Sequence, residues 1–110
     1  MDMEYKTLVD QANDLEMDEK KFRQEMEKLD ALVAKRKAKA NEILETIGSY
    51  DSAVAAQLDM ELSDISKFEY AKDSAVWEAE QEFAAQRSAI NEKLEELEKG
   101  ENEESYDEGR

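Results

Sequence analysis

The chain of 110 residues has no cysteine, no histidine and no proline, and only three glycines. The lack of Cys excludes disulfides and thiol nucleophiles, and the lack of Cys and His together excludes the usual zinc ligands and a histidine general base. The glycines form no phosphate-binding loop, and the acidic residues lack the spacing and central glycine of a calcium loop. We therefore expect a protein that is not an enzyme and needs neither cofactor nor metal.

Long apolar runs are also missing, so the sequence predicts no bilayer-spanning helix, and the segment Met1 to Asp10 is too charged for a signal peptide. The simplest expectation is an intracellular, cytoplasmic protein. Its 30 acidic and 15 basic residues give a net charge of −15. That charge disfavours direct binding to nucleic acid or to an anionic membrane, and it favours a protein partner with a basic surface.

What the chain does have is a heptad pattern. A stripe with alternating spacings of four and three runs through the first half, and twelve of its fourteen members are apolar, the exceptions being Glu19 and Arg36. The stripe comprises Met1, Tyr5, Leu8, Ala12, Leu15, Glu19, Phe22, Met26, Leu29, Val33, Arg36, Ala40, Ile43 and Ile47. A repeat sustained over six heptads is typical of a coiled coil. It predicts a helix over about 2–47, roughly 70 Å long at 1.5 Å per residue.

The repeat stops at Gly48, a C-cap signal, and Ser49, Asp51 and Ser52 can each N-cap a new helix. We expect a turn over 48–52 and a second helix over about 53–99, ended by Gly100. A short connection makes two long helices antiparallel neighbours. The predicted fold is all-α, an antiparallel two-helix coiled-coil hairpin over 1–99, followed by an acidic, mobile tail over 100–110.

The apolar stripe of the second helix is less regular. It comprises Leu58, Leu62, Ile65, Val76, Ala79, Phe83, Ile90 and Leu97, and it is interrupted by Glu69, Lys72 and Gln86. Phe68 falls on one side of this stripe, and Tyr70 and Trp77, seven residues apart, fall on the other. We interpret Phe68, Tyr70 and Trp77 as a self-association surface through which two hairpins form a four-helix bundle. The alternative is a stripe that rotates along the helix.

Negative charge is concentrated in two segments. Residues 1–19 carry a net charge of −6 and residues 78–110 a net charge of −8, which leaves −1 for residues 20–77. A hairpin brings these two segments together at its open end. The candidate partner-binding residues of this acidic end are Asp10, Asp14, Asp18, Glu19, Glu80, Glu82, Glu92, Glu95, Glu96 and Glu98. The acidic end either docks on a basic surface or only keeps the protein in solution.

A basic run follows in the first helix, made of Lys35, Arg36, Lys37 and Lys39. Facing residue numbers in this hairpin should add up to roughly a hundred, so the run should oppose Asp59, Glu61 and Asp64. We interpret it as a cross-helix ion-pair cluster that fixes register, not as a nucleic-acid patch.

Three functions remain open. The first is an inhibitor or regulator that imitates nucleic acid and occupies a basic groove, a role typical of small acidic helical proteins of phages. The second is a scaffold or chaperone-like coiled coil that binds through Tyr70 and Trp77. In the third, the turn is the working part: Asp51-Ser52-Ala53, with Glu45 nearby, resembles the acidic tip of the factors that insert a coiled coil into the secondary channel of RNA polymerase. Unlike some of those factors, this chain has no zinc-binding cysteines.

Overall fold

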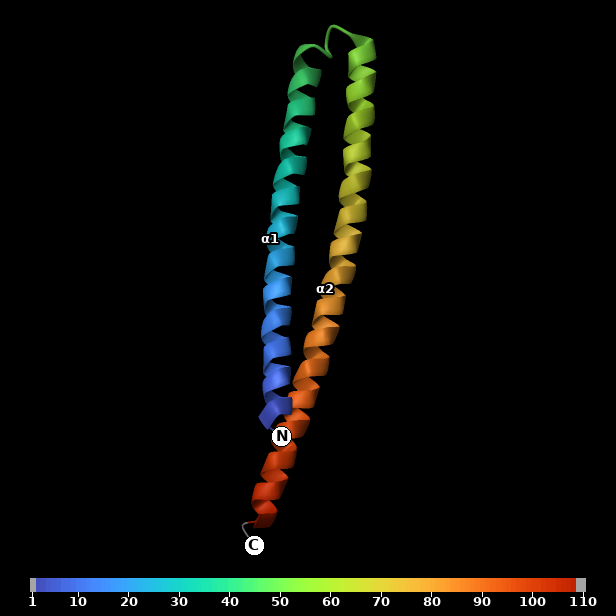
Figure 1. The fold of residues 1–110 in the computed structure, drawn as a ribbon. Coiled ribbons are helices and arrows are strands. Elements are labelled where there is room, and N and C mark those ends of the chain that lie inside the picture. Colours follow the sequence, from blue (N-terminus) through green and yellow to red (C-terminus); the bar gives the residue numbers. More distant parts are fainter. Residues whose placement is uncertain (1, 109–110) are drawn as a thin grey trace. The chain divides into compact units, whose positions relative to one another are not determined.

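Two long helices form the structure, a computed structural model that describes the backbone of residues 2–108 and the side chains of residues 3–100. Helix α1 spans Asp2–Thr46 and helix α2 spans Ser52–Glu108, and the described residues include no strand (Figure 1). The all-α prediction is confirmed. Neither helix, over the described residues, holds an apolar stretch long enough to cross a lipid bilayer.

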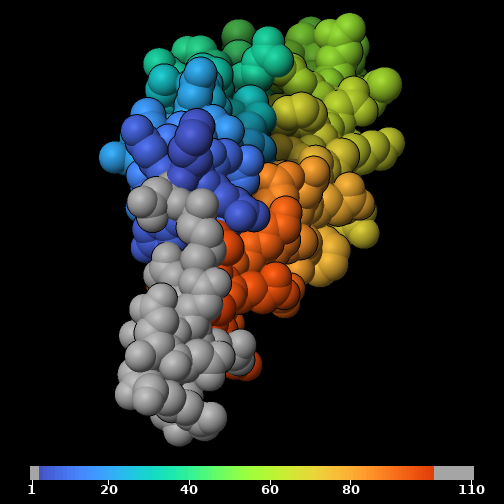
Figure 2. Space-filling view, turned by 60° about the horizontal axis from the view of Figure 1, so that its bottom comes forward, coloured from blue at the N-terminus to red at the C-terminus, as the bar shows by residue number. Residues whose placement is uncertain are grey.

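The chain divides into two compact units, each built from one segment of α1 and one of α2. Unit 1 comprises Met1–Phe22 and Ala79–Arg110, and unit 2 comprises Arg23–Glu78 with the turn between the helices. In each unit the two segments run antiparallel (Figure 1). In the space-filling view, the start of α1, in blue, lies against the orange part of α2, and both segments belong to unit 1 (Figure 2).

The turn between the helices is held by backbone hydrogen bonds. The amides of Ile47 and Gly48 donate to the carbonyl of Ile43, at 2.9 and 3.0 Å, and the amides of Tyr50 and Asp51 donate to the carbonyl of Ile47. No described glycine has a positive φ, so Gly48 is not a left-handed C-cap. Its role is steric, because a Cβ at this position would lie only 2.7 Å from the carbonyl oxygen of Leu44.

Asp51 caps the second helix. Its Oδ1 accepts hydrogen bonds from the amides of Ala53, at 3.0 Å, and Val54, at 3.2 Å. These amides belong to the first turn of α2, where no intrahelical acceptor exists, and an aspartate is among the best residues for this position. Of the three predicted N-caps, the structure therefore uses Asp51.

The prediction that Gly100 ends the second helix is wrong, since α2 continues to Glu108. A single glycine costs only about 1 kcal/mol in a helix interior, and the positive φ that marks a glycine C-cap is absent. The predicted mobile tail over 100–110 is thus helical to Glu108, and its side chains beyond Gly100 lie outside the described residues.

The core is a row of side chains between the two helices, without a fully enclosed centre. The buried apolar residues are Leu8, Leu15, Ala40 and Leu58, and no described side chain is less than 2% exposed. The α1 stripe is confirmed from Leu8 to Val33 and at Ala40 and Ile43, where every member is buried or partly buried. Three members differ: Tyr5 and Ile47 are exposed, and Lys37 takes the place that was predicted for Arg36. Met1 lies outside the described residues.

The α2 stripe is also confirmed, because all eight of its predicted apolar members are buried or partly buried. The rings of Phe22 and Phe83 meet across unit 1, with centroids 5.7 Å apart and planes inclined by 52°. Two of the three interruptions, Glu69 and Lys72, are partly buried members of the same row, whereas Gln86 is exposed. The row is therefore polar in unit 2 at these two positions.

Candidate functional site

Unit 1 collects the predicted acidic residues of both chain segments. Asp10, Asp14 and Asp18 follow one another at intervals of four along α1, so they lie on one side of the helix, and all three are exposed. The α2 members are exposed as well: Glu80, Glu82, Glu92, Glu95, Glu96 and Glu98. Nine of the ten predicted residues are thus exposed within a single compact unit.

Glu19 is the exception and corrects the prediction. It is only 6% exposed, and both of its carboxylate oxygens accept hydrogen bonds from Nη1 of Arg87, at 3.1 and 3.5 Å. Burying a carboxylate is unfavourable unless it is paired, and the guanidinium supplies the pairing from the opposite helix. Glu19 therefore joins the two segments of unit 1 and is not open to a partner. The sequence already indicated that Glu19 is buried, because this residue falls in the apolar stripe of the first helix.

The unit boundaries also adjust the predicted charge distribution. Unit 1 carries a net charge of −11 and unit 2 a net charge of −4, because Lys20 and Lys21 belong to unit 1 and Glu78 belongs to unit 2. The difference in net charge between the two parts is smaller than in the predicted division, which gave −14 and −1, but unit 1 still carries the larger negative charge.

A shallow groove runs between the two helices of unit 1, and we call it the unit 1 groove. It consists of two depressions of about 500 and 390 Å³ that share Gln11. Its lining comprises Met3, Glu4, Thr7, Leu8, Gln11, Asp14, Leu15 and Asp18 from α1 and Gln86, Ala89, Ile90, Lys93 and Glu96 from α2. Four carboxylates against one lysine make the lining acidic, and Leu8, Leu15 and Ile90 make part of it apolar. Three predicted residues line it, namely Asp14, Asp18 and Glu96.

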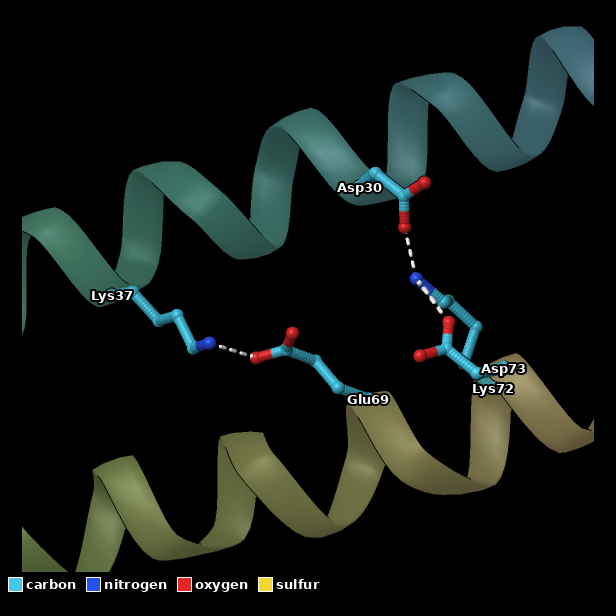
Figure 3. A network of polar contacts seen from close by, with 5 residues as sticks. All are labelled: Asp30, Lys37, Glu69, Lys72 and Asp73. Atoms are coloured by element: carbon cyan, nitrogen blue, oxygen red, sulfur yellow. Dashed lines mark hydrogen bonds and ion pairs between the residues drawn. The ribbon is translucent and has the colours of Figure 1, made fainter.

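Unit 2 contains cross-helix ion pairs of the predicted kind, but with different partners (Figure 3). Nζ of Lys37 lies 2.5 Å from Oε1 of Glu69 on α2. Nζ of Lys72 pairs with Asp30 on α1 and lies 3.2 Å from Oδ1 of Asp73. The numbers of the paired residues add up to 106 for Lys37 and Glu69 and to 102 for Asp30 and Lys72, close to the predicted value. The prediction of register is sound, and two of the three polar interruptions of the α2 stripe, Glu69 and Lys72, carry the pairs.

Two further residues of the basic run, Lys39 and Arg36, differ from Lys37 in their contacts. Lys39 lies 3.8 Å from Glu42 on its own helix, so it does not face the returning helix as predicted. Arg36 lines a groove together with Glu61 and Asp64, as its predicted position required, yet it forms no ion pair within the described part of the chain. Of the four residues of the basic run, all within the described part of the chain, Lys37 is the one that pairs with the opposite helix.

The environment of Lys72 raises the pKa of its ammonium group above the usual value. The hydrogen bond to Asp30 is the largest cause, and the contact with Asp73 acts in the same direction against partial desolvation. The side chain is only 12% exposed, and its ammonium pairs with two exposed carboxylates, Asp30 and Asp73. The ammonium is thus held in its charged form by two carboxylates.

The predicted aromatic surface does not form one face. Tyr70 and Trp77 are 81% and 63% exposed, as expected for residues that a helix pair does not cover. Phe68 is 47% exposed but lies on the opposite flank of the helix row, because two residues correspond to a rotation of about 200°. It lines the groove with Arg36 instead.

The turn residue Asp51 was predicted as a possible working tip. Its carboxylate already accepts the two amide hydrogen bonds of the N-cap. The groove that contains Phe68 was not predicted, although Leu32 and Phe68 are both apolar residues outside the stripes.

No protein-family model matches the chain, and neither a curated protein nor a solved structure shows significant similarity to it.

Proposed function

We propose that the chain is a non-enzymatic binding protein that inhibits or regulates a DNA- or RNA-handling protein by occupying its basic, nucleic-acid-binding surface. The observation that supports this proposal is the collection of nine exposed carboxylates from two distant chain segments within unit 1. Such a target implies a place of action inside a cell, in the cytoplasm, or in the host cytoplasm if the protein is viral.

The arrangement on α1 suits this role. Asp10, Asp14 and Asp18 form a line with a rise of about 6 Å per step on a rigid helix. A basic surface that holds successive phosphates has cations spaced along a line, and it releases counterions when an anionic ligand binds. A line of carboxylates can pair with the same line of cations, although it has no nucleobases for the target to recognise.

The unit 1 groove adds a second kind of contact. Lys and Arg side chains carry long aliphatic stems below their charged ends. Leu8, Leu15 and Ile90 can contact such stems, while Asp14, Asp18 and Glu96 receive the charged ends. A basic protein surface therefore fits the groove better than a small cation does, because only the protein surface supplies both parts.

The proposal is tested by a pull-down from lysate with the tagged protein, eluted by a salt gradient. Each captured protein is then tested for binding to a labelled DNA or RNA duplex, with and without the chain as competitor. We expect release at moderate salt, since exposed charge contacts are screened, and displacement of the duplex by the chain.

Two matched variants identify the surface. The unit 1 variant is Asp14→Asn, Glu92→Gln, Glu95→Gln and Glu98→Gln. The control removes the same number of exposed acids from unit 2 and is Glu27→Gln, Glu45→Gln, Asp59→Asn and Glu78→Gln. The unit 1 variant should lose competition, and the control should keep it. Equal loss in both variants, or binding that persists at high salt, would contradict the proposal.

A further inference from the structure

Unit 2 has an apolar groove that the helix pair itself leaves open, and we call it the unit 2 groove. Its volume is about 710 Å³, larger than either depression of unit 1. The apolar lining comprises Leu29, Leu32 and Val33 from α1 and Ile65 and Phe68 from α2. Leu32 is 63% exposed and Phe68 is 47% exposed, so two large apolar side chains face solvent on opposite walls of one groove.

Charges of opposite sign stand on the two walls. Arg36 is on the α1 wall, and Glu61 and Asp64 are on the α2 wall. Within the described part of the chain none of these three side chains takes part in an ion pair or hydrogen bond, although the adjacent Lys37 is paired with Glu69. The groove thus presents a cation and two anions that the chain does not use for itself.

These walls are complementary to each other when two copies meet. A two-fold axis parallel to the helices sets the α1 wall of one copy against the α2 wall of the other. Arg36 then faces the partner's Asp64 and the partner's Glu61, and Leu32 packs beside the partner's Phe68. An isologous contact of this kind forms each interaction twice.

We propose that a second copy of this chain occupies the unit 2 groove, so that the two copies of unit 2 form a four-helix bundle. A second copy is the occupant that the groove itself specifies, because each wall supplies the groups that the other lacks. The pairing does not involve Tyr70, which lies on the other flank of α2. It is also independent of the acidic surface of unit 1, so either proposal can fail alone.

Sedimentation velocity of the full chain, from low to high micromolar concentration, tests the proposal. We expect a species of twice the chain mass of 12.7 kDa that dissociates on dilution. Phe68→Ala should shift the equilibrium toward monomer, whereas the control Tyr70→Ala, which truncates a more exposed aromatic on the same helix, should not. A wild-type chain that is monomeric throughout would overturn the proposal, and so would equal effects of the two variants.

Charge reversal provides a test that leaves the helix row of unit 2 intact. Arg36→Glu alone, and the pair Glu61→Arg with Asp64→Arg alone, should each raise the dimer dissociation constant by roughly tenfold or more, because like charges then face each other. An equimolar mixture of the two variant chains should form a heterodimer in which both facing sites are again complementary. Failure of the mixture to associate better than either variant would show that the walls do not face each other. Circular dichroism confirms that each variant keeps its helix content.

Discussion

Exchanging the charges of Lys37 and Glu69 tests the antiparallel register of unit 2. The two side chains meet at 2.5 Å and are 40% and 30% exposed. Pairs with this much exposure contribute about 0.2–1 kcal/mol, and screening by solvent keeps the value within that range. Lys37→Glu removes the attraction and adds a repulsion of similar size, so it should lower the free energy of unfolding by about 1 kcal/mol.

The double variant Lys37→Glu with Glu69→Lys restores opposite charges across the helices and should recover most of this loss. Urea unfolding followed by far-UV circular dichroism measures Lys37→Glu, Glu69→Lys and the double variant against the wild type, and the coupling should shrink at high salt. Lys39→Glu is the control, because Lys39 pairs on its own helix with Glu42 and should not be rescued by Glu69→Lys. A double variant no more stable than Lys37→Glu alone would refute the register.

Three further predictions concern stability. Leu58 is 8% exposed and Met60 is 68% exposed, so in urea unfolding Leu58→Ala should cost about 2–3 kcal/mol, while Met60→Ala should stay within about 0.5 kcal/mol. Asp51→Ala should cost about 1 kcal/mol in thermal unfolding, whereas Asp51→Asn should be nearly neutral because Asn is an equally good N-cap; a large loss for Asn would contradict the capping role. The third rests on the raised pKa of Lys72 in the folded state. The ion pairs of Lys72 stabilise the fold fully below the unfolded-state pKa of about 10.4, and this stabilisation is lost as pH rises through the higher folded-state pKa. Unfolding measured across that alkaline range should therefore show a steeper loss of stability for the wild type than for Lys72→Met, and parallel curves would contradict the pairing.

The heptad pattern predicted the fold well because each helix buries one narrow stripe. Burial follows this stripe from Leu8 to Val33 in α1, and the break at Gly48 marks the turn. The helix end at Gly100 could not be predicted in the same way, since one unfavourable glycine does not outweigh the helical residues on both sides. Local signals thus locate a helix end reliably only where another feature, here the cap at Asp51, agrees with them.

The candidate site was predicted in part. Exposed acids on helices are readable from their positions outside the stripe, which is why Asp14, Asp18 and Glu96 were found. Glu19 differs from these acids by its place in the apolar stripe, whereas its pairing with Arg87, 68 residues away in the sequence, could not be predicted from the stripe. The unit 2 groove forms because side chains of α1 and α2 lie beside each other. The apolar periodicity of a single helix does not show which residues of the other helix lie next to it.

The lack of any fully enclosed side chain among residues 3–100 has a consequence for how each unit opens. In each unit the side chains of one helical turn pack only against the facing turn of the other helix, and such a pair of facing turns forms one layer. One layer can therefore separate while the others stay packed. Stability is then close to a sum over neighbouring layers, as in repeat proteins. Amide hydrogen exchange should consequently be graded from layer to layer, with fast exchange at helix ends and slower exchange near Leu15 and Leu58, instead of one uniform rate set by global unfolding.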